Sequence, residues 1–387
     1  MKRFAYILVA MAWLAGDVAQ AQVSTEMSNG WTFTFSGNVN TFLTYEKEDE
    51  DGDSQAPIGL VGTSIEQTRV QTGLLPSAAI FSAKGKEGNT DLSVNFGFYP
   101  QVQCATGTHD CFGAQIDMRQ AYLTAGGSWG EIKAGRDLGL FGRQNILTDQ
   151  TLFGVGATGA QLGGAGTTLG RIGFGYNYPQ FKAQFTYSTP GGKPTQLSVG
   201  VFEAAANGAY AKTNAPRVEA EFVYAKDNLK GWVGGIAQST KSPVTNKSAT
   251  ATGFSGGLRW GNENFSLTGS GYYGKGIGTI LLFLGGVCDC ASGGSSDLRP
   301  AYGYIGQFTY TFGKATLAGS YGASVLEAAD NEAGFTNENA LASAGLYYQA
   351  TKSLKVVFEG NYTTSQDKDA GGKNSSVALA AGLMLFF

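Results

Sequence analysis

Apolar and polar side chains alternate along the C-terminal segment of the chain, residues 375–387. Successive side chains of a β-strand point to opposite faces, so this segment predicts a strand with one continuous apolar face. Such a strand fits a wall that meets lipid on one side, and a closed barrel leaves no unpaired edge in a membrane. We therefore expect the last strand to pair with the first. The apolar positions are Val377, Leu379, Ala381, Leu383, Leu385 and Phe387.

Three further segments, residues 31–45, 91–103 and 302–312, repeat this period of two. Their apolar faces are rich in Phe, Tyr, Val and Leu, while their polar faces carry mainly Ser, Thr, Asn and Gln. A β-sandwich has the same period, but its polar face usually carries more charge. The pattern therefore favours strands with lipid on one side and water on the other.

The connections between the expected strands are of two alternating kinds, short and long. Seven short and eight long connections give about sixteen strands, and at roughly ten residues for each crossing these strands use about 160 residues. We predict an all-β fold, a closed antiparallel transmembrane β-barrel. The short connections are residues 86–89, 126–130, 191–194, 226–230, 261–264, 313–314 and 350–353, and the long ones are residues 46–64, 104–113, 138–170, 204–216, 239–249, 276–300, 328–337 and 366–374.

One expected strand changes its phase. Ile172, Phe174, Tyr176 and Tyr178 occupy even positions, whereas the apolar residues from Phe181 to Tyr187 occupy odd ones. Proline lacks a backbone donor and is tolerated at bulges, so the pattern predicts one strand with a β-bulge at residues 179–180 and both apolar sets facing outward.

The N-terminus indicates export. A basic start is followed by an apolar run over residues 4–16 and a small-x-small site ending at Ala21, which predicts a signal peptide over residues 1–21 and a barrel domain over residues 22–387. Removing the signal changes the formal net charge from −3 to about −4, because Lys2, Arg3 and Asp17 are lost. This balance argues against a nucleic-acid partner.

The composition supports strands. Glycine is frequent, at 58 of 387 residues, proline occurs only 9 times, and charged residues make up 15%. Much glycine weakens helices, and the low charge is unusual for a soluble domain. A secreted adhesin or solenoid would share the glycine and the signal, but no fixed repeat favours it.

Several segments carry a resemblance to a known family. They are residues 118–123 (MRQAYL), 129–136 (WGEIKAGR) and 196–201 (QLSVGV), together with the terminal Phe387 and an opening strand that ends in Tyr45. On these residues the chain resembles the trimeric general porins of the Gram-negative outer membrane, particularly the proteobacterial type. The resemblance implies a water-filled barrel of sixteen strands in the outer membrane, a homotrimer, and a third long loop that folds inward and narrows the pore.

In this chain that loop is residues 138–170, the longest connection. Its apolar side chains are many to leave in water, and packing against the inside of the wall would cover them. Opposed charges across a narrow lumen create a transverse field that discriminates between permeating ions, and the basic excess beside the loop hints at small organic anions. We expect this constriction to be formed by Arg69, Asp117, Arg119, Glu131, Lys133, Arg136, Asp137, Arg143, Asp149 and Arg171.

Four cysteines allow three pairings in an oxidising compartment. Cys104 and Cys111 close a small loop and form the expected disulfide, while the pairing of Cys288 and Cys290 stays open. No metal or other cofactor is expected, because the spacing around His109 matches no tetrahedral zinc pattern.

An enzyme is not expected either, since the single histidine has no evident nucleophile or orienting group. We therefore predict a porin for passive diffusion of small hydrophilic solutes and ions, with outer-membrane lipid and lipopolysaccharide as its surroundings. The alternative is a non-conducting structural or adhesive barrel. The acidic run over residues 46–53 could bridge lipopolysaccharide through Ca²⁺ or be a solvated loop.

Overall fold

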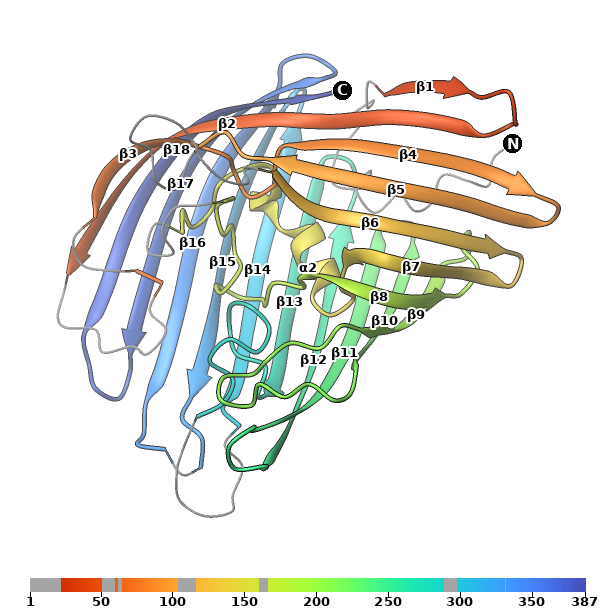
Figure 1. Ribbon diagram of the computed structural model, residues 1–387. Helices are drawn as coiled ribbons and strands as arrows, with labels where there is room; N and C mark the ends of the chain where they lie inside the picture. Colours follow the sequence, from red (N-terminus) through yellow and green to blue (C-terminus); the bar gives the residue numbers. More distant parts are fainter. Residues whose placement is uncertain are drawn as a thin grey trace, which may run out of the picture.

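The computed structural model describes residues 22–50, 60–61, 65–103, 116–159, 166–288, 298–330 and 332–387. These residues form one antiparallel sheet that curves around a central space (Figure 1). No helix among them has the length and hydrophobicity needed to cross a bilayer. The strands are β1 (Val23–Glu26), β2 (Thr32–Glu50), β3 (Glu66–Gln71), β4 (Ala78–Glu87), β5 (Thr90–Pro100), β6 (Ile116–Gly127), β7 (Gly130–Leu138), β8 (Phe181–Ser188), β9 (Thr195–Phe202), β10 (Arg217–Lys226), β11 (Leu229–Lys241), β12 (Ser248–Gly261), β13 (Phe265–Lys275), β14 (Pro300–Phe312), β15 (Ala315–Glu327), β16 (Thr336–Gln349), β17 (Leu354–Asp367) and β18 (Lys373–Phe386).

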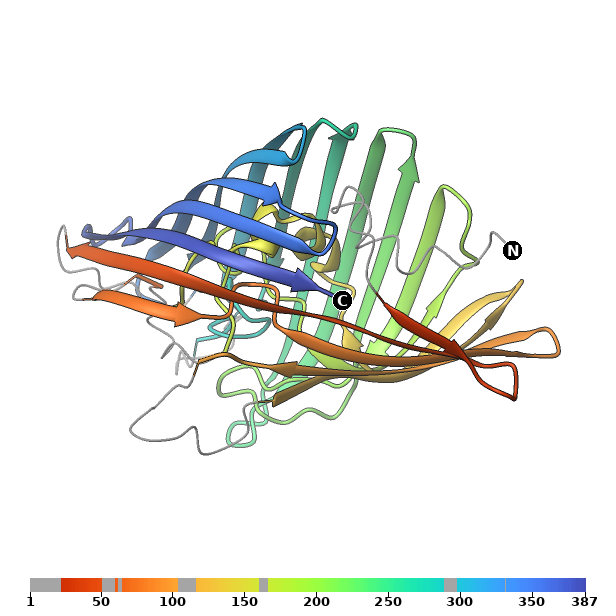
Figure 2. The same cartoon turned by 90° about the horizontal axis from the view of Figure 1, so that it is seen from above.

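The barrel closes where β18 pairs with β2, from Phe386 opposite Asn38 to Asn374 opposite Glu50 (Figure 2). Beyond β18, the N–H of Phe387 donates to the carbonyl of Gly37 at 3.0 Å. β3 and β4 pair with the two halves of β2 and together form one strand of the wall, while β1 is a short addition beside the start of β2. The eighteen strands of the sheet therefore make a closed wall of sixteen, as predicted.

Each strand has one outward and one inward face, as the alternation predicts. Large apolar side chains such as Phe185, which is 65% exposed, lie on the outer surface, whereas Asn40 and Thr44 are buried on the inner one. Near the tight turns the outer face carries aromatic residues, among them Trp129, whose ring stacks with that of Tyr187. Aromatic belts of this kind are typical of the boundary between lipid and water.

The seven predicted short turns are confirmed, since each joins two neighbouring strands from β4–β5 to β16–β17. The strand ends next to the long connections lie at the other end of the wall. In one of these connections Cys288 is disulfide-bonded. Cys104, Cys111 and Cys290 lie outside the described residues, as does His109, so the bridge between Cys104 and Cys111 stays a prediction.

The predicted strand over residues 172–187 is wrong in its first half. β8 begins only at Phe181, and Ile172, Phe174 and Tyr176 are buried rather than facing lipid. They pack in a core cluster with Ile280 and Ile305. Apolar residues do alternate with a period of two over this segment. Here, however, the alternation packs a buried connection against the core and does not form a strand. The shift in register lies elsewhere, between Gly97 and Phe98 of β5, opposite β6.

The break between β3 and β4, residues 72–77, was not predicted. Here the chain leaves the wall, and the N–H groups of Leu74 and Leu75 donate to the carbonyls of Gly154 and Leu152 at 2.9 and 3.2 Å. The β7–β8 connection thus takes the place of a neighbouring strand for these donors, which satisfies backbone groups that would otherwise be unpaired.

Candidate functional site

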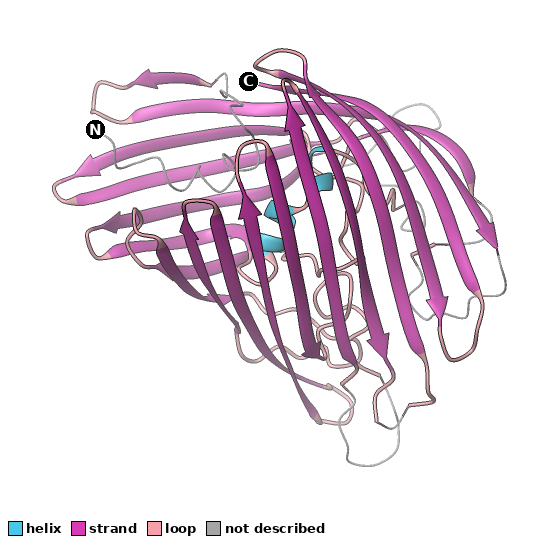
Figure 3. Ribbon diagram, turned by 180° about the vertical axis from the view of Figure 1, so that it is seen from behind, coloured by secondary structure: helices cyan, strands magenta, loops and turns pink. Residues whose placement is uncertain are grey.

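The connection between β7 and β8, residues 139–180, carries the only two helices among the described residues. They are α2 (Arg143–Thr148) and the short 3-10 helix η1 (Gln150–Phe153). Gly142 precedes α2 with φ 79°, a conformation that favours glycine. Asp149 ends α2 and caps η1 by accepting from the N–H of Thr151 at 2.8 Å. Figure 3 shows both helices, in cyan, within the curve of the strands.

Two carboxylates of β10 hold the first part of this connection. Glu219 Oε2 accepts from the backbone N–H groups of Leu140 at 2.6 Å and Phe141 at 2.9 Å. Glu221 pairs with Arg143 at 2.5 Å. Both acids are buried and lie on the inward face of β10, opposite in parity to the lipid-facing Phe222. Two charge-assisted contacts to one segment fix its position against this side of the wall.

A third carboxylate, on β17, holds the second part. Glu359 Oε2 accepts from the N–H groups of Val155 at 2.7 Å and Gly156 at 3.0 Å. The Tyr347 hydroxyl of β16 donates to the other oxygen of the same side chain. Further around the ring, Gln307 of β14 donates to the carbonyl of Thr148. The connection therefore contacts the inward faces of β10, β14 and β17.

Asp149 and Arg171 lie inside this packing, and the prediction that they line a water-filled constriction is wrong. Arg171 is fully buried and donates to Ser320 Oγ at 2.9 Å and to the carbonyl of Leu341 at 3.0 Å. Asp149 accepts from the Tyr176 hydroxyl at 2.8 Å. Burial, with the Asp149 carboxylate adding to it, raises the pKa of Tyr176 well above its ordinary value and keeps this donor protonated. Arg171 bridges the connection to β15 and β16, whereas Asp149 holds the connection together from within.

On β6 and β7, four of the expected residues, Asp117, Arg119, Lys133 and Asp137, do face inward, but they pair with each other. Arg119 Nε lies 2.8 Å from Asp117 Oδ2, and its guanidinium stacks 5.6 Å from the centre of the Tyr99 ring. Lys133 pairs with Asp137, four residues along the same strand. Since each base is compensated by a nearby acid, these four groups form local dipoles rather than a basic patch.

Arg136 does not face the lumen, so its prediction as a constriction residue is wrong. It lies opposite Ala121 and Ala183 on the same face of β7 as Ile132, which is exposed on the outer surface. Strand parity alone would have shown this, because Lys133 and Arg136 differ by an odd number of positions.

Four further basic residues face inward. The sequence analysis named one of them, Arg69, and missed the other three. No salt bridge joins Arg69, Lys84, Lys230 or Lys355 to an acid within the described residues, and we call these four the unpaired bases. Arg69 and Lys84 lie on β3 and β4, Lys230 on β11 and Lys355 on β17. Among the acids that were predicted to face inward from the wall, Glu131 forms no ion pair within the described residues.

The charged positions of β10 were also missed. Arg217, Glu219 and Glu221 alternate with lipid-facing residues, and Arg217 pairs with Glu219 at 2.8 Å in a fully buried contact. The run R-V-E-A-E carries the signal, since period-two charge in an otherwise apolar strand points to an inward face.

The sequence matches the family described as Gram-negative porin over residues 7–382. The chain therefore belongs to this family, and it is an outer-membrane channel for passive diffusion. No curated protein sequence matches it significantly.

Solved porin structures share the fold. The outer membrane channel DcaP of Acinetobacter baumannii is 16% identical with a TM-score of 0.69, over 94% of this chain and 100% of that one. The anion-selective porin from Comamonas acidovorans is 13% identical with a TM-score of 0.64, over 92% and 100%. OmpF of Salmonella typhi is 13% identical with a TM-score of 0.57, over 93% and 100%.

Proposed function

We propose that the β7–β8 connection narrows the lumen and sets the size of the solutes that pass. The observation that carries this proposal is the set of buried carboxylates Glu219, Glu221 and Glu359, which bind the connection from two sides of the wall. An unsatisfied buried N–H costs about 1–3 kcal/mol, so these acceptors give the connection a strong preference for its place.

The channel favours small organic anions. Its inward acids are largely occupied, because Glu219, Glu221 and Glu359 bind the connection and Asp117 and Asp137 pair with neighbouring bases. Of the unpaired bases, Arg69, Lys84 and Lys230 are left to act on permeating ions, whereas Lys355 is buried against the ring of Phe153. A lumen lined by one uncompensated sign attracts ions of the opposite sign. The anion-selective porin from Comamonas acidovorans, a protein of similar fold, supports the same preference.

The mature protein is a homotrimer without enzymatic activity. It is exported by the signal peptide over residues 1–21 and surrounded by outer-membrane lipid and lipopolysaccharide. The trimer draws support from a neighbour in fold described in its trimer form, OmpT of Vibrio cholerae. Passive diffusion needs no catalytic group, only a wet, charged passage.

Planar bilayers test these statements together. Purified protein should give stepwise conductance, with closures in groups of three for a trimer. In a salt gradient the reversal potential should have the sign of an anion-favouring pore, and small carboxylates should carry current. Silence would support a non-conducting barrel, and a reversal potential of the opposite sign would overturn the anion preference.

A further inference from the structure

The connection between β13 and β14 packs against the β7–β8 connection. It begins with residues 276–288, which we call the mouth segment. Most of the apolar side chains of this segment are buried, with Ile277 at 0% and Ile280 at 1% exposure. Ile280 belongs to one core cluster with Ile172, and Ile277 belongs to another with Phe141. Two residues of the mouth segment thus pack with two parts of the β7–β8 connection.

The backbone of the mouth segment is held in an uncommon shape. Phe283 has φ 72°, a conformation that a bulky side chain rarely adopts. Its ring is buried, and its centre lies 5.8 Å from the guanidinium carbon of the buried Arg217. Strain of this kind persists only where the surroundings fix the residue, and strained residues are frequent at functional sites. The mouth segment is therefore a specifically packed element of the fold.

The mouth segment reaches from one side of the wall to another. It leaves the wall at the end of β13, and the carbonyl of Ile280 accepts from the N–H of Tyr178, shortly before β8, at 2.8 Å. The Tyr178 hydroxyl accepts from Arg119 of β6 at 3.4 Å. In the closed wall of sixteen, β8 lies five strands from β13 and β6 lies seven. These contacts join nearly opposite sides of the barrel at the end with the long connections, which is typically the outer one (Figure 1).

Two large apolar side chains of the mouth segment stay exposed. Leu281 is 39% and Leu284 46% exposed, whereas Leu282 and Phe283 between them are buried. Leu281 forms a backbone bridge with Tyr178 and so lies at the contact that spans the barrel. Exposed apolar surface is unfavourable in water, and an apolar group that covers it is stabilised there. The segment thus offers an apolar surface to solutes at the outer end of the barrel.

We propose that the mouth segment is a second constriction element, and that Leu281 and Leu284 make the channel favour organic anions with an apolar body. This inference rests on the proposed preference for small organic anions and names their class, short alkyl carboxylates rather than hydroxylated ones. The unpaired bases Arg69, Lys84 and Lys230 attract the carboxylate, while the two leucines remove part of the alkyl chain from water. Each methylene group removed from water favours the contact about fourfold.

The test compares hexanoate with gluconate. Both are carboxylates with six carbons and one negative charge, but only hexanoate has an apolar body. Their permeability ratio follows from the reversal potential of the full mature protein in a planar bilayer with one anion on each side. The double variant Leu281→Asn, Leu284→Asn keeps the side chains near their native size and removes the apolar surface. We expect the ratio of hexanoate to gluconate to fall about fourfold, the contribution of one methylene contact.

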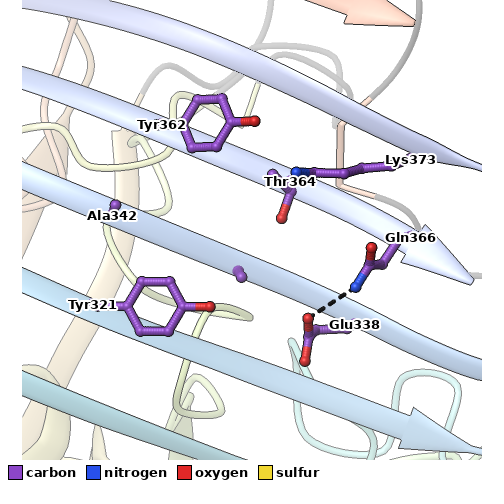
Figure 4. A pocket seen from close by; sticks show the side chains of 8 residues that line it. Tyr321, Glu338, Ala342, Tyr362, Thr364, Gln366 and Lys373 are labelled. Atoms are coloured by element: carbon purple, nitrogen blue, oxygen red, sulfur yellow. Dashed lines mark hydrogen bonds between the residues drawn. The ribbon is translucent and has the colours of Figure 1, made fainter. Parts of the chain in front are cut away.

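The matched control changes polarity at nearly constant size on the outer face of the barrel. Thr364 shares one face of β17 with Tyr362, which is exposed on the outer surface. Together with Tyr321 these residues line a groove of about 170 Å³ over β15 to β18 (Figure 4). Because this groove lies outside the lumen, Thr364→Val should leave the permeability ratio within about twofold of the native value.

A further variant tests the constriction itself. Phe283→Gly relieves the backbone strain and removes the ring beside Arg217, so the mouth segment should loosen and single-channel conductance in potassium chloride should rise. Unchanged conductance in this variant, an unchanged ratio in the leucine variant, or an equal fall in Thr364→Val would overturn the proposal. The ratio compares two anions of equal charge, so it can be measured even if the potassium chloride gradient shows a cation preference. Failure of the proposed anion preference is therefore recognised separately.

Discussion

The inward faces of β10 and β17 differ from those of β6 and β7 although all four carry acids. On β10 and β17, Glu219 and Glu359 are buried and accept backbone N–H groups of the β7–β8 connection. On β6 and β7, Asp117 and Asp137 pair with bases of their own strand. The same residue types thus anchor the connection on one side of the lumen and balance cations on the other.

The difference arises because a carboxylate satisfies whichever donors lie nearest. Where the connection covers the wall, its backbone N–H groups have lost water and need acceptors. Where the wall is not covered in this way, Arg119 and Lys133 supply the donors instead. Inward charge therefore has two roles in this barrel, and they can be separated by substitution.

The largest effect is expected from removing an anchor. Glu359→Ala leaves the N–H groups of Val155 and Gly156 without their acceptor, at about 1–3 kcal/mol each, so the connection should move and single-channel conductance should rise with more noise. Glu131→Ala is the control, because Glu131 is an inward acid that makes no hydrogen bond or ion pair with the described residues of the connection. Identical conductance in both variants would mean that Glu359 does not hold the constriction.

A smaller effect is expected from the unpaired bases. Replacing Arg69, Lys84 and Lys230 together by Ala removes three uncompensated cations, so the ratio of anion to cation permeability should fall about two- to fivefold, or ~0.5–1 kcal/mol. The reversal potential in a potassium chloride gradient measures it. An unchanged potential would contradict the assignment of anion preference to these bases.

The paired bases should matter less. Arg119→Ala with Lys133→Ala removes two cations but frees Asp117 and Asp137, so the reversal potential should shift toward cations. Adding Asp117→Asn and Asp137→Asn should return it close to that of the native protein, since the four groups are then neutral as a set. Failure of the quadruple variant to restore the potential would mean that the pairs do not act as local dipoles.

The smallest effect concerns two outer loops joined by Arg299 and Glu332. The hydrogen bond from Arg299 lowers the pKa of Glu332 below its ordinary value of 4.5. A lowered pKa means that this contact contributes fully at neutral pH and is lost as the pH falls through the folded value. Proteolysis of these loops should therefore increase below about pH 4.5 in the native protein, and Glu332→Gln should remove this pH dependence.

The strands and their faces could be predicted from the sequence because lipid and water impose a period of two on each strand. Parity placed Lys133 and Asp117 correctly, and strict use of it would have placed Arg136 outside. The same rule failed for Ile172 and Phe174, because a buried connection can also alternate apolar residues. Nothing local marks the break after Gln71, whose donors are satisfied by residues far along the chain.

The sequence by itself determined the number of wall strands and, for most positions of the wall, the side to which the side chain points, since both follow from local alternation and turn residues. Only the tertiary structure decided which inward charges meet. Glu359 and Val155 are 204 residues apart, and the closed ring brings them within 2.7 Å. Such a contact depends on the curvature of the whole wall and on the path of one connection across it, which no local pattern encodes.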